Sequence, residues 1–164
     1  MIIAILIGIL FLDFIFLPSF FRFYDSSLSS LFLISVILYY GINKNTVLFV
    51  FLSALLIELL AGYNPGLYSI AFLLCVLILF ILSKTFNIPT VSQASSIFTY
   101  AGLSIMGVFI NYLLSVIFIS ISGIIQGNIS RDFNVIYNSI HLYHLAEIFL
   151  LFLCLNLVKN TKFL

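Results

Sequence analysis

Glu58 is the residue of this 164-residue chain whose type and position point most directly to chemistry. It lies inside a long apolar run, four residues before Gly62 opens the turn Gly-Tyr-Asn-Pro-Gly. If that run crosses a bilayer, a carboxylate at the helix centre costs roughly 2.5–3.5 kcal/mol on insertion scales, and the cost falls toward the interfaces. Such a group usually faces other protein or a wet cavity. Glu58 therefore marks a place where the chain does more than span lipid.

Two interpretations of Glu58 remain open from the sequence. Ala54, Ala61 and Gly62 stand at −4, +3 and +4 from Glu58, which is one side of a helix. Small residues allow a second helix to approach closely. In the packing interpretation, Glu58 is clamped between helices and satisfied by Asn or Tyr groups. In the functional interpretation, it contacts a partner's transmembrane segment or a ligand.

A second polar group lies in the last apolar run, where His141, His144 and Glu147 are spaced i, i+3 and i+6. On a helix they share a face about 120° wide, which is compatible with a metal half-site or a proton relay. A metal would need further ligands, and only Glu58 and Asp13 are candidates. The zincin signature H-E-x-x-H is absent. We favour a polar stripe hydrogen-bonded to neighbouring helices and predict no metal site.

Asn111 belongs to a seam of small and polar residues in the fifth apolar run. The spacing is 3, 4, 4 and 7 residues, close to the helical period, over Ser104, Gly107, Asn111, Ser115 and Ser122. Helix–helix packing in lipid explains such a seam more simply than a transport path does.

Composition makes the bilayer the solvent of this chain. It is 64% hydrophobic and 7% charged, more apolar surface than a soluble domain of this size can bury. The net charge of +1 gives no attraction to nucleic acid. Cys75 and Cys154 lie in apolar runs and are predicted to be buried free thiols. The sequence has no P-loop, G-x-S-x-G or G-x-G-x-x-G motif, so we expect neither an enzyme nor a cofactor.

The elements that must position these residues are predicted to be helices, because lipid accepts only helices or closed barrels and the runs lack strand-like alternation. We predict an all-α integral membrane protein, a single domain over residues 1–164 built as a bundle of six transmembrane helices. The first run is read as a retained span and not a cleaved signal peptide. The predicted spans are 2–21, 28–42, 46–61, 67–82, 95–121 and 139–158. The stretch 123–138 leaves room for an interfacial helix.

Basic residues set the predicted orientation. With the N-terminus inside, Lys44, Lys84, Lys159 and Lys162 are cytoplasmic and Arg22 and Arg131 are outside. An N-in, C-in topology follows. It places the buried polar residues in or near the outer half of the bilayer, namely Asp13, Glu58, Asn111, His141, His144 and Glu147.

The segment 51–74, FLSALLIELLAGYNPGLYSIAFLL, resembles the hallmark of the rod shape-determining MreD family. That hallmark is a small-residue-rich helix ending in an acidic residue and leucines, then a Gly-containing turn and a Gly that opens the next helix. The matching elements here are Ala54, Glu58, Leu59, Leu60, Gly62, Pro65, Gly66 and Leu67.

The resemblance implies a non-enzymatic scaffold in the bacterial cytoplasmic (inner) membrane. It would belong to the elongasome, the peptidoglycan-synthesis machinery that sets cell shape. Implied partners are MreC-like and MreB-like proteins and wall-synthesis enzymes. The candidate contact residues are Asp13, Ala54, Glu58, Gly62, Asn64, Pro65, Gly66, Asn111, His141, His144 and Glu147.

The MreD family is also similar in fold to the S components of energy-coupling-factor vitamin transporters, which supplies an alternative. In that alternative, the chain binds a small molecule in a pocket open to the outside, and the outer polar residues line the pocket. The segment 51–74 fits the shape-determining family better.

Overall fold

The computed structural model describes residues 1–20, 28–87, 97–126 and 132–160, with side chains except at positions 20, 97–100, 126 and 132–145. Every regular element in these ranges is a helix. Four of the described helices are long and apolar enough to cross a membrane. The predicted all-α class is therefore confirmed for the described residues.

The first helical rod contains a π-helical segment around Asp13. The rod is formed by α1 (Ile2–Phe11), η1 (Leu12–Phe16) and α2 (Leu17–Phe20). Pro18 has no backbone N–H and cannot bond the carbonyl four residues earlier. In the wider turn just before it, the Leu17 N–H bonds the Leu12 carbonyl instead. The π segment keeps the rod continuous. Because its turn is wider than an α-helical turn, the residues before and after it face different directions.

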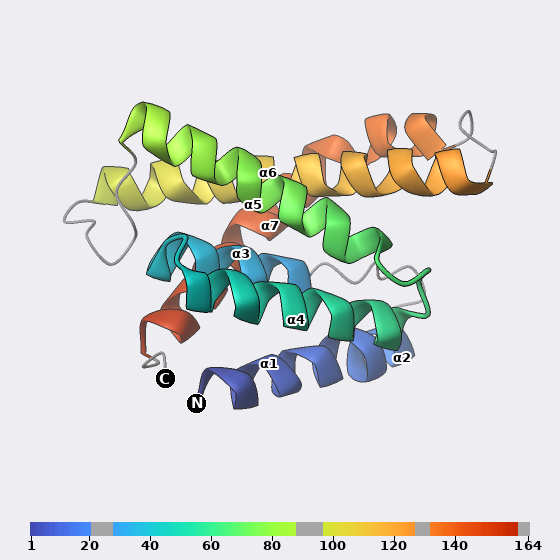
Figure 1. The fold of residues 1–164 in the computed structure, drawn as a ribbon, viewed down its shortest axis with the longest axis horizontal. Coiled ribbons are helices and arrows are strands. Elements are labelled where there is room, and N and C mark those ends of the chain that lie inside the picture. The colour runs from blue at the N-terminus through green and yellow to red at the C-terminus, as the bar shows by residue number, and fades with distance from the viewer. Residues whose placement is uncertain (21–27, 88–96, 127–131, 161–164) are drawn as a thin grey trace.

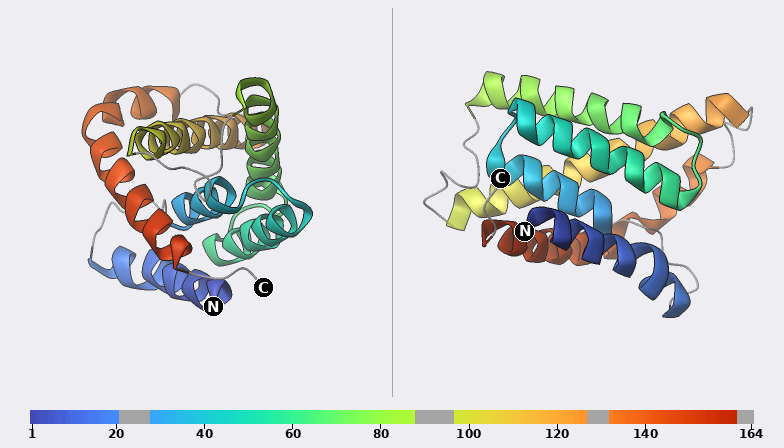
Figure 2. Two further views of the ribbon diagram at one scale, coloured as in Figure 1. Left: turned by 90° about the vertical axis from the view of Figure 1, so that its left-hand side faces the viewer. Right: turned by 60° about the horizontal axis from the view of Figure 1, so that its bottom comes forward.

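The third helix, α3 (Leu28–Tyr40), is the centre of the bundle. It packs against α1, α4, α6 and α7, and the end-on view of Figure 2 shows it surrounded. Residues 29–38 are all buried. A helix that is apolar on all sides is expected in such a place.

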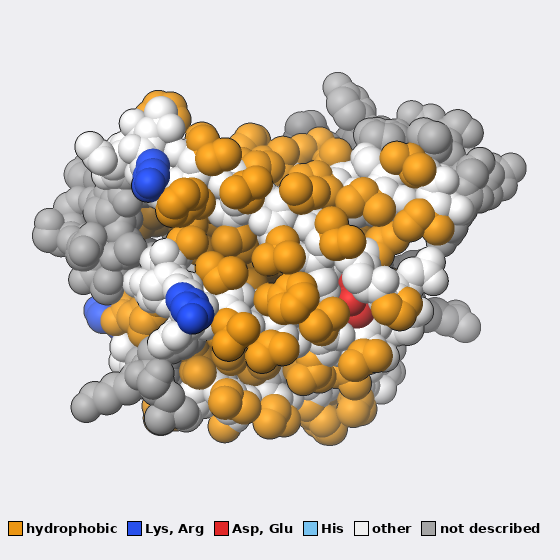
Figure 3. Space-filling view, viewed as in Figure 1, with side chains coloured by type: hydrophobic (Ala, Val, Ile, Leu, Met, Phe, Trp, Pro, Cys, Tyr) orange, Lys and Arg blue, Asp and Glu red, His pale blue; other side chains and the backbone are white. Residues whose placement is uncertain are grey.

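The remaining helices alternate in direction between the two ends of the bundle (Figure 1). They are α4 (Lys44–Ala61), α5 (Leu67–Phe86), α6 (Ile97–Gln126) and α7 (Asp132–Lys159). Lys44 begins α4, and Lys84 and Lys159 lie in the last turns of α5 and α7, all at one end. Figure 3 shows the blue basic side chains at that end and an apolar band between the ends. Arg22, Arg131 and Lys162 lie outside the described residues.

Several helix ends differ from the predicted spans. Lys44 and Asn45, which fall between the predicted spans 28–42 and 46–61, belong to the first turn of α4. Asn43 is the N-cap, and its Oδ1 accepts from the Thr46 amide at 2.9 Å. In the α4–α5 hairpin, α5 continues beyond the predicted end at residue 82 to Phe86. Its C-cap is Asn87, which has a left-handed backbone conformation. Polar residues near a span end do not stop a helix; it ends where its backbone groups find caps.

The stretch 123–138 was expected to leave room for an interfacial helix, and the structure assigns most of it differently. Residues 123–126 end α6, and residues 132–138 begin α7. Residues 127–131 lie outside the described part of the chain. The described apolar residues of this stretch, in 123–126 and 132–138, prolong two long helices, so both helices extend beyond the predicted spans.

Candidate functional site

Glu58 lies in the last turn of α4 and caps the start of α5. One carboxylate oxygen accepts from the Gly66 amide at 2.9 Å, and the other accepts from the Ser69 amide at 2.7 Å. Gly66 is the N-cap residue of α5, and Ser69 is its third residue. The Glu58 side chain is only 2% exposed. Both of its oxygens are thus committed within the chain.

The turn between α4 and α5 brings the carboxylate and the amides together. Gly62 ends α4 with φ of 69°, and the amides of Gly62 and Tyr63 both bond the Glu58 carbonyl. Gly66 has φ of 90°. Glycine is suited to both positions because a Cβ disfavours positive φ. Asn64 and Pro65 stand exposed at the tip of the turn.

Asp13 does for α3 what Glu58 does for α5. It is fully buried on η1, and its Oδ2 accepts from the Ser29 amide at 2.9 Å. Ser29 is the second residue of α3. A carboxylate from a different helix therefore meets the first turn of α3 as well as that of α5.

The physical reason is common to both carboxylates. The first amides of a helix have no partner within it, and a helix N-terminus carries partial positive charge. In hydrocarbon each unpaired backbone group costs several kcal/mol. A buried carboxylate accepts such amides and is itself stabilised by them. Each contact therefore offsets two costs at once: the cost of a charge without water, and the cost of backbone amides without water.

Two further contacts join the capped ends. The hydroxyls of Ser30 on α3 and Tyr68 on α5 are hydrogen-bonded to each other. The Tyr68 and Tyr63 rings lie 5.7 and 5.0 Å from the ring of Phe118 on α6, centroid to centroid. We call Asp13, Ser29, Ser30, Glu58, Gly66, Tyr68 and Ser69 the capping cluster. It links α4 to α5, α5 to α3 and α3 to the first rod.

Asn111 and Glu147 form a separate polar contact between α6 and α7. The Asn111 amide nitrogen donates to a Glu147 carboxylate oxygen at 3.3 Å. Asn111 is 5% exposed and Glu147 is half-buried. His141 and His144 fall on α7, but their side chains lie outside the described residues.

The small residues around Glu58 have unlike roles. Ala54 is fully buried on α4. Gly62 was expected to let another helix approach, but there is open space where its Cβ would be. Its positive φ explains why this position suits glycine. Close approach occurs at Gly107 on α6, where a Cβ would lie 2.5 Å from Leu151 of α7 and 3.2 Å from Leu38 of α3. That contact fits the packing explanation of the fifth-run seam.

In chemical terms the carboxylates of the capping cluster hold backbone amides at the starts of α3 and α5. The hydroxyls of Ser30 and Tyr68 bond each other, whereas the buried hydroxyls of Ser29 and Ser69 have no hydrogen-bond partner among the described residues. The described residues contain no group of three or more His, Cys, Asp or Glu side chains placed to hold a metal ion. Cys75 and Cys154 are buried free thiols, as predicted.

The fold and the cluster define a class: an all-helical protein with helices suited to a membrane, tied together at one end by buried carboxylates. Comparison with models of known protein families, with curated proteins and with solved structures gave no match.

Proposed function

We propose that this chain is a non-enzymatic scaffold of the bacterial inner membrane, of the MreD kind, with six spans and both termini in the cytoplasm. Its role is to hold partner membrane proteins of the cell-elongation machinery. The partners include a single-span, MreC-like protein, and through them MreB-like filaments and wall-synthesis enzymes. Glu58 and the turn that follows it carry this proposal.

The proposal is supported because the segment that resembles the MreD hallmark, residues 51–74, forms one structural unit. In that segment the acidic residue, the turn glycines and the start of the next helix are one hydrogen-bonded unit through Glu58, Gly62 and Gly66. The spacing of the acid and the glycine is what a carboxylate needs to reach the next helix. A rigid hairpin tip of this kind suits a binding element, because little conformational entropy is lost on docking.

The surface beside this unit is free for a partner. Leu59 and Leu60 are 78% and 52% exposed, and Asn64 and Pro65 are exposed at the tip. In this proposal a partner's transmembrane segment packs on the two leucines, and its outer end meets the tip. Glu58 then acts by holding the hairpin in shape and does not touch the partner.

The test is co-purification of tagged protein with the MreC-like partner encoded by the same bacterium. Leu59→Ala combined with Asn64→Ala is expected to weaken co-purification, and cells that depend on this variant are expected to round up. Leu77→Ala, which truncates a 54% exposed leucine on α5, is the matched control and should retain both binding and rod shape.

Membrane level and thermal midpoint of each variant separate lost binding from lost folding. The proposal fails if depletion of the chain leaves cells rod-shaped. It also fails if the double variant, present at normal level, keeps full partner binding.

A further inference from the structure

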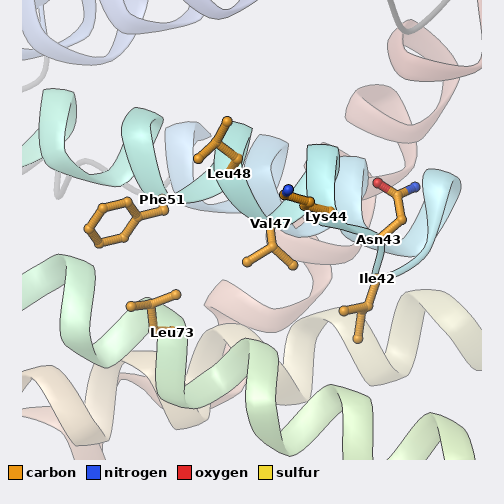
Figure 4. Close-up of a pocket in the computed structure, with 7 residues that line it drawn as sticks. All are labelled: Ile42, Asn43, Lys44, Val47, Leu48, Phe51 and Leu73. Atoms are coloured by element: carbon orange, nitrogen blue, oxygen red, sulfur yellow. The ribbon is translucent and has the colours of Figure 1, made fainter.

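A groove lies between α4 and α5 and runs from the start of α4 at Lys44 to the middle of the two helices, at Phe51 and Leu73. Its volume is about 500 Å³, and its lining residues are Ile42, Asn43, Lys44, Val47, Leu48, Phe51 and Leu73. In Figure 4, Val47 points from α4 toward α5 and Leu73 points from α5 toward α4. In Figure 1 the ribbons of α4 and α5 meet near their connecting turn and lie farther apart toward the basic end.

The chemistry of the lining is sharply divided. Ile42, Val47, Leu48, Phe51 and Leu73 offer only hydrocarbon and one aromatic ring, whereas Lys44 and Asn43 stand exposed at one side. In a bilayer, a depression lined this way is filled by hydrocarbon, because its walls offer water no hydrogen bonds. Lys44 lies where α4 begins, at the end of the bundle where α5 and α7 finish with Lys84 and Lys159 in their last turns.

We propose that this groove binds one anionic glycerophospholipid. An acyl chain lies along Val47, Phe51 and Leu73, and the phosphate pairs with the Lys44 ammonium while Asn43 supplies a neutral donor. Charge complementarity selects the headgroup, since basic residues beside hydrophobic helices attract anionic lipid. The inference rests on the chain lying in a membrane, but it is independent of any scaffold partner.

Lys84 has a different setting, which makes Lys44 the residue to test. The Lys84 ammonium lies 4.9 Å from the centroid of the Phe80 ring, and neither residue lines the groove. Lys159 ends α7 at the same end of the bundle and provides a control with the same loss of charge.

The experiment is native mass spectrometry of the purified full chain, titrated with phosphatidylglycerol or phosphatidylcholine of identical acyl chains. The wild-type chain is expected to retain phosphatidylglycerol in preference to phosphatidylcholine. Lys44→Gln should reduce that preference about fivefold, the effect of one lysine near an anionic surface. Lys159→Gln should leave it unchanged. Glycerol phosphate, which has the charge without the chains, should not compete.

The acyl part is tested separately. Val47→Trp fills the groove and should lower retention of both lipids, whereas Leu52→Trp, on an exposed part of α4 outside the groove, should not. Equal retention of the two lipids by wild type, or an unchanged preference in Lys44→Gln, overturns the proposal. So does a photo-crosslinker at position 48 that labels a protein and no lipid in native membranes. Failure of partner co-purification leaves this result untouched, so the two proposals are tested apart.

Discussion

At the scale of single residues, the backbone hydrogen bonds that the buried carboxylates accept explain why these side chains are present. Glu58 receives two amide hydrogens from α5, and Asp13 receives one from α3. An acidic side chain at such depth is costly alone, and so is an uncapped helix start in hydrocarbon. Placing one against the other removes much of both costs. This is a reason for Glu58 to be present that requires no bound ligand.

A pair of substitutions measures this role. Glu58→Gln keeps one acceptor oxygen and should cost less than Glu58→Leu, which leaves the Gly66 and Ser69 amides unpaired. An unsatisfied buried donor costs roughly 1–3 kcal/mol, so we expect Glu58→Leu to lower the free energy of unfolding by several times RT. Thermal unfolding in a mild detergent gives the comparison. Equal midpoints for Glu58→Leu and wild type would show that the caps contribute nothing.

At the scale of helices, the bundle depends on how closely α6 can approach α3 and α7. Gly107 sits at that contact, with Leu151 and Leu38 against the position a side chain would take. Small residues at a crossing let helices in lipid gain dispersion contacts that larger residues would prevent. Gly102, on the same helix, faces open space.

Alanine should therefore destabilise the protein at Gly107 but not at Gly102. Gly107→Ala forces Leu151 or the α6 backbone to move and should destabilise by about 1–3 kcal/mol, the usual cost of overpacking. Gly102→Ala should be neutral or stabilise by up to about 1 kcal/mol, because alanine favours a helix more than glycine does. Unfolding midpoints of the two variants decide the matter, and a midpoint for Gly107→Ala as high as that for Gly102→Ala would refute the packing assignment.

At the scale of the whole molecule, the two ends differ in chemistry. One end holds the capping cluster and the exposed tip at Asn64, and the other holds Lys44, Lys84 and Lys159. Positive residues favour the cytoplasmic side, so the tip is expected to face outward. The native Cys75 and Cys154 are buried at 2% and 3% exposure, which keeps background labelling low.

The orientation is tested with a membrane-impermeant maleimide. Asn64→Cys should react in intact cells, whereas Lys44→Cys should react only after permeabilisation. The unmodified chain reports the background from its own thiols. The reverse pattern would invert the topology and with it the outward placement of the proposed docking tip.

The sequence by itself determined the solvent and the class of fold. An apolar content this high indicates lipid as the surrounding medium. In lipid the backbone must satisfy its own hydrogen bonds, and a helix does so within one segment. The turn at 62–66 and the start of α5 at Leu67 were predictable because Gly and Pro have strong local preferences. The burial of Glu58 and Cys75 followed from their apolar neighbours.

Only the tertiary structure decided what the polar residues contact. Nothing in the sequence near Asp13 shows that it meets Ser29, or that Glu58 reaches backbone amides and not Asn or Tyr groups. Nor does a glycine reveal whether it serves a turn, as Gly62 does, or a close crossing, as Gly107 does. Helix periodicity fixes faces, but a face acquires its partner only when rotation, tilt and helix ends are set together by packing.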